Sequence, residues 1–243
     1  MKKTVLISGA SHGIGRAAAV RFAKEGYTVI LNCRQSKDEL LALEGELRQR
    51  FGVECYSFVG NIGDSKFVSD MFAQIAEKTG GVDIVINNAG ISYIGLLSEM
   101  TDSDWNDVMS TNLNAVFYCS RAAIPYMLSQ KRGRILNVSS VWGNVGASME
   151  VAYSAAKGGV NAFTKALAKE LAPSNIQVNA IAFGTIDTRM NACFSAEERT
   201  MLEEEIPIGR FGTPEEAAEF IYQTATAPDY LTGQILTFDG GWC

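Results

Sequence analysis

Short apolar runs alternate with longer amphipathic stretches along the whole sequence. Seven runs, several of them apolar on both faces, are predicted strands: Thr4–Ser8, Thr28–Asn32, Cys55–Val59, Asp83–Asn87, Arg134–Val138, Gln177–Ala182 and Gln234–Phe238. The stretches between them predict helices over 13–25, 37–51, 65–79, 102–130, 153–172 and 214–226, with Ser65, Thr101 and Thr213 as helix starts. This alternation predicts an α/β fold, a doubly wound sheet of seven parallel strands with helices on both faces.

No linker, repeat or composition change divides the 243 residues, so we expect a single domain over 1–243. The longest connection, 184–212, carries Met190, Phe194 and Met201 beside three consecutive glutamates. Two interpretations stay open for this segment. It is either a surface connection with one helix or a mobile lid over an apolar substrate.

Charge, cysteine and histidine content argue against several classes of function. The net charge is −6, so nucleic acid is a poor candidate partner. No apolar stretch is long enough to span a bilayer. Five widely spaced cysteines favour a reducing, cytoplasmic location and argue against a disulfide framework or a thiolate zinc site. The single histidine, His12, argues against a Ser-His-Asp hydrolase and excludes a multi-histidine metal site, so we expect no metal.

A glycine-rich loop joins the first predicted strand to the first predicted helix. It reads Ser8-Gly9-Ala10-Ser11-His12-Gly13-Ile14-Gly15. Glycines let the backbone turn tightly and approach a ligand closely, and the N-terminus of the following helix suits a diphosphate. Tight strand–helix packing is the alternative explanation. The position directly after the first strand of a repeated βα pattern favours dinucleotide binding.

The second predicted strand ends at Asn32-Cys33-Arg34, without the carboxylate that usually binds the ribose 2′-hydroxyl of NAD. The guanidinium of Arg34 suits a 2′-phosphate, and His12 could assist from the glycine-rich loop. The alternative is a solvated arginine on a surface turn. We therefore predict NADP(H) as the cofactor.

Tyr153 and Lys157 stand four residues apart at the start of a predicted helix, so both side chains can reach one site. A neighbouring ammonium favours the phenolate, and we expect it to lower the tyrosine pKa from about 10 toward neutrality, into the range of acid–base catalysis. The alternative is an ordinary helix face. Ser139 and Ser140 follow the fifth strand, at the sheet edge where ligands bind. Asn112 lies within a predicted helix, where asparagine is unfavourable unless its amide has a structural partner or a function.

These motifs, in this order, resemble the short-chain dehydrogenase/reductase family, and the resemblance covers essentially the whole chain. The matching segments are Ser8-Gly9-x-x-x-Gly13-Ile14-Gly15, Asn87-Asn88-Ala89-Gly90, Asn112, Ser140 and Tyr153-x-x-x-Lys157. The resemblance implies a Rossmann-type fold, an NADP-dependent oxidoreductase and a homotetramer. The tetramer would form partly through helices 102–130 and 153–172 and the chain end. Ala155, Ala156 and Ala162 would allow close helix approach or would pack on the sheet.

The resemblance also implies a role for each matching residue. Tyr153 would be the general acid that protonates the substrate oxygen, and Lys157 would hold the nicotinamide ribose. Ser140, rather than Ser139, would orient the carbonyl, and Asn112 would hold a water that links Lys157 to solvent. The implied cofactor contacts are Gly9, Ser11, His12, Gly13, Ile14, Gly15, Arg34, Asn61, Ile62, Asn88, Ala89, Gly90, Tyr153, Lys157, Ile186 and Thr188.

Two positions depart from the family pattern. Ser8 stands where threonine is usual, and Phe183-Gly184 replaces a Pro-Gly pair after the sixth strand. Loss of the proline removes a fixed φ, so we expect the nicotinamide-side loop to sit differently or to be more mobile.

The C-terminal motifs resemble family members that reduce a 3-oxoacyl thioester carried on acyl carrier protein in fatty acid synthesis. The motifs are Gly209-Arg210-Phe211-Gly212-Thr213-Pro214-Glu215-Glu216, Tyr230-Leu231-Thr232-Gly233-Gln234 and Asp239-Gly240-Gly241. Lys131, Arg132 and Arg134 form a small basic group that either docks such an acidic carrier or is merely solvated. The alternative substrates are a steroid, a sugar or polyol, or a xenobiotic ketone. A dinucleotide-binding sensor without catalysis is a third possibility.

Overall fold

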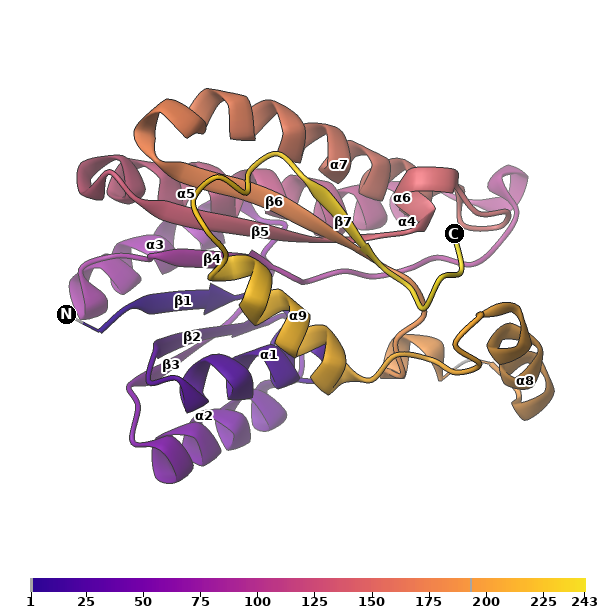
Figure 1. Ribbon diagram of the computed structural model, residues 1–243, viewed down its shortest axis with the longest axis horizontal. Coiled ribbons are helices and arrows are strands. Elements are labelled where there is room, and N and C mark those ends of the chain that lie inside the picture. Colours follow the sequence, from indigo (N-terminus) through magenta and orange to yellow (C-terminus); the bar gives the residue numbers. More distant parts are fainter. Residues whose placement is uncertain (1, 193) are drawn as a thin grey trace.

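A parallel sheet of seven strands runs through the middle of the molecule (Figure 1). The computed structural model describes residues 2–192 and 194–243. The strands are β1 (Thr4–Ile7), β2 (Thr28–Cys33), β3 (Cys55–Val59), β4 (Ile84–Asn87), β5 (Gly133–Ser140), β6 (Ile176–Phe183) and β7 (Ile235–Phe238). Their order is β3-β2-β1-β4-β5-β6-β7, and every pair is parallel. The predicted doubly wound sheet is confirmed.

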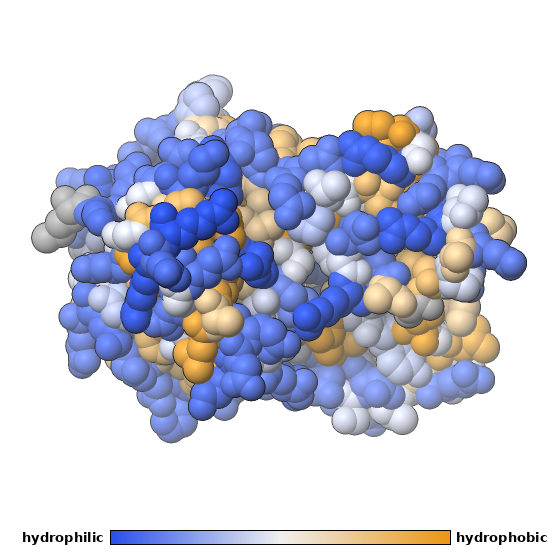
Figure 2. Space-filling view, turned by 90° about the horizontal axis from the view of Figure 1, so that it is seen from below, coloured by the Kyte–Doolittle hydropathy of each residue, from blue (hydrophilic) through white to orange (hydrophobic). Residues whose placement is uncertain are grey.

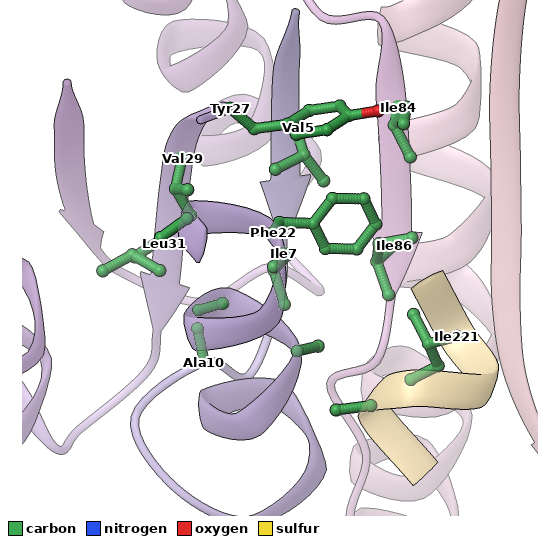
Figure 3. Packing of buried hydrophobic residues seen from close by; sticks show 14 of the residues in the cluster. Val5, Ile7, Ala10, Phe22, Tyr27, Val29, Leu31, Ile84, Ile86 and Ile221 are labelled. Atoms are coloured by element: carbon green, nitrogen blue, oxygen red, sulfur yellow. The ribbon is translucent and has the colours of Figure 1, made fainter. Parts of the chain in front are cut away.

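Helices cover both faces of this sheet (Figure 1). The α-helices are α1 (Gly13–Lys24), α2 (Lys37–Phe51), α3 (Ser65–Thr79), α4 (Asp102–Met109), α5 (Ala115–Gln130), α6 (Trp142–Val145), α7 (Val151–Leu171), α8 (Ala196–Glu205) and α9 (Pro214–Ala225). Successive strand residues point to opposite faces, so Val5 and Ile7 pack against α1, α2 and α9, while Leu6 packs against α3, α5 and α7. Figure 3 shows Phe22 of α1 among Val5, Ile7 and Ile86 of the strands.

The boundaries of the elements differ from the predictions at a few points. α3 begins at Ser65, as predicted, but its N-cap residue is Asp64, whose carboxylate accepts hydrogen bonds from the N–H groups of Lys66 and Phe67 at 2.8 and 3.4 Å. The predicted helix 102–130 is interrupted by a π-helical turn at Ser110–Asn114. β5 and β6 are longer than predicted, because they pair with each other over eight residues up to Ser140 and Phe183.

The segment 184–212 contains a short 3₁₀ turn, Arg189–Asn191, and the helix α8. α8 begins at a capping box formed by Ser195 and Glu198, but it buries none of its residues. Figure 1 shows it projecting to one side of the sheet. Figure 2 shows a mostly hydrophilic surface with separate hydrophobic patches, some of them at the end of the molecule where α8 lies. The presence of one helix is compatible with both interpretations of this connection.

The thiols of Cys33, Cys55, Cys119 and Cys243 are free, and Cys193 lies outside the described residues. Residues 2–192 and 194–243 contain no group of His, Cys, Asp or Glu side chains that could hold a metal ion. Within the same residues, no helix has the length and apolar character needed to cross a membrane.

Candidate active site

A cleft of about 360 Å³ lies along the carboxyl ends of the parallel strands. Most of the predicted cofactor contacts line it, although they come from loops far apart in the sequence. The predicted residues that line it are Gly9, Ser11, His12, Gly13, Ile14, Arg34, Asn61, Ile62, Asn88, Ala89, Gly90, Ser140, Tyr153, Lys157, Ile186 and Thr188. Two predicted site residues, Gly15 and Asn112, do not line the cleft, and each has a structural reason to be present.

The glycine-rich loop between β1 and α1 requires glycine for two different reasons. Gly9 and Gly13 have φ angles of +65° and +56°, which favour glycine, and a Cβ on Gly13 would lie 3.2 Å from the Thr188 methyl group. Gly15 is a packing requirement instead, because a Cβ there would lie 2.2 Å from the Gly9 carbonyl oxygen. Tight packing alone therefore explains why residue 15 is a glycine, and its predicted contact with the cofactor stays a prediction.

Hydrogen bonds from the end of β4 hold the glycine-rich loop in place. The Ser8 hydroxyl accepts from the N–H groups of Asn88 and Ala89, both at 3.0 Å. The Asn88 amide donates to the carbonyls of Ser8 and Gly9 at 2.9 and 3.1 Å. Serine supplies the same hydroxyl as threonine, so the departure at Ser8 leaves this network intact. Asn88 therefore holds the glycine-rich loop in position and also lines the cleft.

Arg34, just after β2, lies exposed at one end of the cleft. Within residues 2–192 and 194–243, no carboxylate forms an ion pair with its guanidinium. Ser36, at the N-cap of α2, also lines the cleft and makes no side-chain capping hydrogen bond. A free guanidinium beside an uncapped helix N-terminus suits an anion such as a phosphate.

His12 is the N-cap residue of α1, yet its ring does not cap the helix. Its Nδ1 is 2.9 Å from the Ser11 hydroxyl. Burial first, and then the nearby Arg189 charge, lower the pKa of His12 below 6.5, so its ring is neutral at neutral pH. His12 can therefore assist a phosphate only by donating an N–H hydrogen bond and not by its charge.

Tyr153 and Lys157 lie on α7 and meet at the other end of the cleft. The Lys157 ammonium nitrogen is 5.5 Å from the centre of the Tyr153 ring and donates a hydrogen bond to the Val138 carbonyl at 2.7 Å. The Ser140 hydroxyl, at the end of β5, hydrogen-bonds the phenol. The predicted group of Ser140, Tyr153 and Lys157 is thus assembled at one point.

Burial and charge shift the pKa of this tyrosine in the direction opposite to the prediction. Burial, followed by the Glu150 charge, raises the pKa of Tyr153 to about 12, and the Ser140 hydrogen bond offsets only part of this. Burial lowers the pKa of Lys157 to about 8. The prediction that Lys157 brings the tyrosine pKa toward neutrality is therefore wrong for this structure, because desolvation dominates and the ammonium is turned to a backbone carbonyl. Tyr153 is a neutral phenol at pH 7, which is the form that donates a proton.

Asn112 is fully buried in the π-helical turn. Its amide donates to the carbonyls of Ile91 and Val108 at 2.9 and 2.8 Å, and its oxygen accepts from the Ile91 N–H at 3.2 Å. These contacts give the side-chain amide the structural partners that a buried asparagine needs. A Cβ on Gly90 would lie 2.8 Å from the Asn112 oxygen and 3.7 Å from the Lys157 nitrogen. Asn112 therefore positions the loop next to Lys157.

Ser139 and Ser140 are adjacent, but only Ser140 reaches the phenol. The buried Ser139 hydroxyl donates to the Asn161 amide oxygen at 2.6 Å, and Asn161 in turn donates to Asn144 at 2.9 Å. This chain of hydrogen bonds ties β5, α6 and α7 together, so the Ser139 hydroxyl is already paired. The preference for Ser140 over Ser139 agrees with this geometry.

The loop after β6 makes contacts with neighbouring segments. Phe183 is part of β6, and its ring packs edge-on against Phe238 with centroids 5.7 Å apart. The Gly184 N–H donates to the Phe238 carbonyl at 3.0 Å, and Ile186 forms a parallel bridge with Gly212. The effect of the missing proline on the mobility of this loop stays a prediction.

A second hollow of about 100 Å³ adjoins Ser140 and Tyr153 and extends away from the dinucleotide cleft. Most of the residues that line this hollow, including Trp142, Glu150 and Trp242, are not among the predicted site residues. The two tryptophan rings meet with centroids 5.0 Å apart. Asp239 accepts from the N–H groups of Gly241 and Cys243, at 2.9 and 2.8 Å, and so turns the chain around Trp242. Position next to Ser140 or Tyr153 was the available signal for Trp142 and Glu150, whereas nothing local pointed to Trp242.

The basic group lies at the opposite edge of the sheet. Lys131, Arg132 and Arg134 surround the start of β5, whereas the cleft is at the strand ends. Arg132 pairs with Asp83 at 3.5 Å and Arg134 with Asp229 at 2.6 Å. Two of the three cations are already paired, so this group does not form a dock at the mouth of the site.

Comparison with known proteins gives one consistent result. The family model described as short chain dehydrogenase matches residues 3–199. The chain is 38% identical over 242 residues to the 3-oxoacyl-[acyl-carrier-protein] reductase FabG of Staphylococcus aureus strain Mu50, covering 99% of this chain and 98% of the relative. It is 40% identical over 240 residues to the FabG protein of Thermotoga maritima, covering 98% and 97%.

A solved structure extends the similarity to three dimensions. A crystal structure of actinorhodin polyketide ketoreductase with NADPH superposes with a TM-score of 0.93 and 34% sequence identity, covering 99% of this chain and 97% of that one. Its match extends over the glycine-rich loop, the Tyr153–Lys157 helix and the C-terminal tail alike. The chain belongs to the short-chain dehydrogenase family.

Proposed function

We propose that this protein is an NADPH-dependent 3-oxoacyl-[acyl-carrier-protein] reductase. The observation that carries the proposal is the meeting of Ser140, Tyr153 and Lys157 at the inner end of a cleft built for a dinucleotide. The full-length similarity to the FabG proteins supports the substrate. The reaction converts a 3-oxoacyl thioester to the 3-hydroxyacyl thioester, consuming one hydride and one proton.

The phosphate-binding features support NADPH as the cofactor. The glycine-rich loop and the N-terminus of α1 would hold the diphosphate, and Arg34 would pair with the 2′-phosphate. Asn61 and Ile62 line the region between them, while Ile186 and Thr188 line the end near Tyr153. NADPH supplies the hydride when it is bound.

The chain's own residues would manage the proton and orient the substrate. Ser140 would donate a hydrogen bond to the ketone oxygen, and the neutral Tyr153 phenol would deliver the proton to that oxygen. Lys157 is a cation at pH 7 with its pKa of about 8, so it would bind the ribose and stabilise the phenolate left after proton transfer. Asn112 would keep the neighbouring loop in place and support a water near Lys157.

The segment 184–212 would act as a lid of this single domain. Arg189, in its 3₁₀ turn, forms an ion pair with Glu39 of α2 at 3.6 Å, and Thr188 lies against Gly13. Both contacts connect the segment to the opposite wall of the cleft. The exposed Met190 and Met201 side chains give its surface the apolar character that an acyl chain needs.

We propose that the protein is a cytoplasmic homotetramer. Phe117 of α5 and Trp105 of α4 are large apolar side chains that remain partly exposed, as do Ala155 and Ala162 of α7. Ala156 is fully buried within the chain, so it packs inside rather than between subunits. Sedimentation should give a tetramer, and a monomer at micromolar concentration would contradict this assignment.

The substrate is tested by NADPH consumption with acetoacetyl thioesters, free and on acyl carrier protein, against a panel of steroids, sugars and cyclic ketones. We expect turnover of the thioesters. Turnover of the panel alone would remove the acyl-carrier assignment and keep the family. A cyclic ketone is the second candidate, because the Trp142–Trp242 pair lines the hollow with aromatic surface and the structural neighbour is a polyketide ketoreductase.

A further inference from the structure

The second hollow, which adjoins Ser140 and Tyr153, contains a carboxylate to which the proposed reaction assigns no role. Glu150 is the N-cap residue of α7, three residues before Tyr153. A carboxylate at that position normally accepts hydrogen bonds from the first helical N–H groups, but Glu150 makes no such cap. Its carboxylate instead accepts a hydrogen bond from the Ser92 hydroxyl, on a loop from the other side of the hollow.

The backbone before Glu150 holds this orientation. Met149 has a φ angle of +64°, a left-handed conformation that is unfavourable for a residue with a side chain. Its carbonyl accepts from the Gly95 N–H at 2.9 Å, and the Ser154 hydroxyl accepts from the Ala147 N–H at 3.0 Å. These long-range contacts stabilise the strained turn that directs the carboxylate into the hollow.

Among the residues that the structure describes, no cation forms an ion pair with this carboxylate. Glu150 is the one charged side chain among the described residues that line the hollow, and the other walls include Ile94, Trp142 and Trp242. The ion pairs formed within residues 2–192 and 194–243 do not include it. Its negative charge acts on the phenol, because it contributes to the raised pKa of Tyr153. A substrate held at Ser140 and Tyr153 is therefore within the field of Glu150.

We propose that Glu150 is a specificity-determining residue that selects neutral 3-oxo esters and thioesters and rejects free 3-oxo acids. In a free 3-oxo acid the carboxylate is two bonds from the ketone carbon, so reduction at Tyr153 would bring it into the same half-buried hollow as Glu150. Two like charges within a hollow of about 100 Å³, at an effective dielectric constant of about 20, repel strongly enough to change binding by tenfold or more. A thioester avoids this repulsion. The inference rests on the proposed function and names the feature of the substrate that the hollow recognises, which is the absence of a negative charge next to the ketone.

The test compares two probes that differ in little but charge, acetoacetate and its methyl ester. The measurement is the ratio of their kcat/KM values with NADPH for the wild type, Glu150→Gln and the control Glu77→Gln. Glu77 is an exposed residue of α3, so the control has the same change in net charge outside the hollow. We expect the wild type and the control to favour the ester by at least about tenfold, and Glu150→Gln to lose most of that preference. An unchanged ratio in Glu150→Gln would overturn the proposal.

Binding without turnover separates this inference from the proposed function. In a Trp105→Phe background the two remaining tryptophans both line the hollow, so fluorescence quenching reports occupancy directly. The ester should quench at lower concentration than the acid in the wild type, and Glu150→Gln should bring the two concentrations together. If neither probe is reduced, the proposed function fails while this binding comparison still decides the role of Glu150. If Glu150→Gln does not fold, raised salt should narrow the wild-type difference, and a difference that is independent of salt would count against the proposal.

Discussion

The two ends of the cleft are built by different means. At the phosphate end, backbone groups define the shape, since Gly9 and Gly15 are packed against the turn after β4 and Asn88 ties the two loops together. At the substrate end, side chains define the shape, and Trp142, Glu150 and Trp242 come from three separate parts of the chain. A backbone site binds the part of a ligand that is the same in every reaction. A side-chain site can vary with the substrate while the chemistry is kept.

The largest effect should come from the phenol, where the two ends meet. Tyr153→Phe removes the proton donor but keeps the ring, so we expect reductase activity to fall by a hundredfold or more, on the scale of general acid catalysis. NADPH binding, followed by cofactor fluorescence, should persist because the phosphate end is unchanged. Near-normal turnover would remove Tyr153 from the mechanism.

Burial of the Lys157 ammonium in the active site should lower the free energy of unfolding. Its folded-state pKa of about 8 is below the ordinary 10.5, so from pH 8 to 9 this lysine binds more protons in the unfolded chain and stability rises with pH. The full shift corresponds to about 3 kcal/mol of unfolding free energy. Lys157→Met should lose activity, be at least as stable as the wild type at pH 7, and lack this rise.

Chemical denaturation between pH 7 and 9 provides that measurement. The range stops at pH 9 because the buried thiols of Cys55 and Cys119, with pKa values raised from 9.0 to about 12, have the opposite effect above that point. A parallel pH dependence in wild type and Lys157→Met would show that burial of the ammonium does not destabilise the fold.

Alanine substitutions at Gly15 and Gly45 test whether close backbone packing defines the phosphate end of the cleft. A Cβ on Gly15 would lie 2.2 Å from the Gly9 carbonyl oxygen, whereas a Cβ on Gly45, within α2, meets nothing within 4 Å. Gly15→Ala should therefore cost about 1–3 kcal/mol of stability and weaken NADPH binding. Gly45→Ala should stabilise the protein by about 0.5–1 kcal/mol, because alanine favours the helix. Equal thermal midpoints for the two variants would contradict the conclusion that close packing requires glycine at position 15.

Arg34 should give the smallest and most selective effect. Arg34→Ala removes a guanidinium that we assign to the 2′-phosphate, so NADPH affinity should fall by about tenfold or more while NADH affinity changes little. Arg16→Ala is a suitable control, because Arg16 is a cation on α1 that already pairs with Glu46 at 2.6 Å. Equal weakening of both cofactors by Arg34→Ala would favour NAD.

Most of the fold and much of the site could be predicted from local patterns. Strands such as Thr28–Cys33 are buried along their whole length, so their apolar composition identifies them directly. Tyr153 and Lys157 are one helical turn apart, and that spacing alone brings them to one site. Ser140 could be chosen over Ser139 only by resemblance, because adjacent residues of a strand point to opposite faces and the register decides which one meets the phenol.

The electrostatic state of the site could not be predicted in the same way. The spacing of Tyr153 and Lys157 suggested a lowered tyrosine pKa, but burial and Glu150 raise it, and both depend on how α7 packs over β5. Asn112 shows the same limit, since its amide was free to bind water or backbone until the loop at Ile91 was placed beside it.

The sequence by itself determined the alternating strands and helices, the glycine-rich turn and the helical pairing of phenol and ammonium, because each depends on residues a few positions apart. The tertiary structure decided which glycine serves packing, which serine meets the phenol, and which carboxylate and tryptophans enclose the substrate. Those outcomes depend on distances between segments that are up to 150 residues apart, as between Ser92 and Trp242, and on the water that their packing removes. Desolvation acts over the whole neighbourhood of a group, so no local spacing can reveal it.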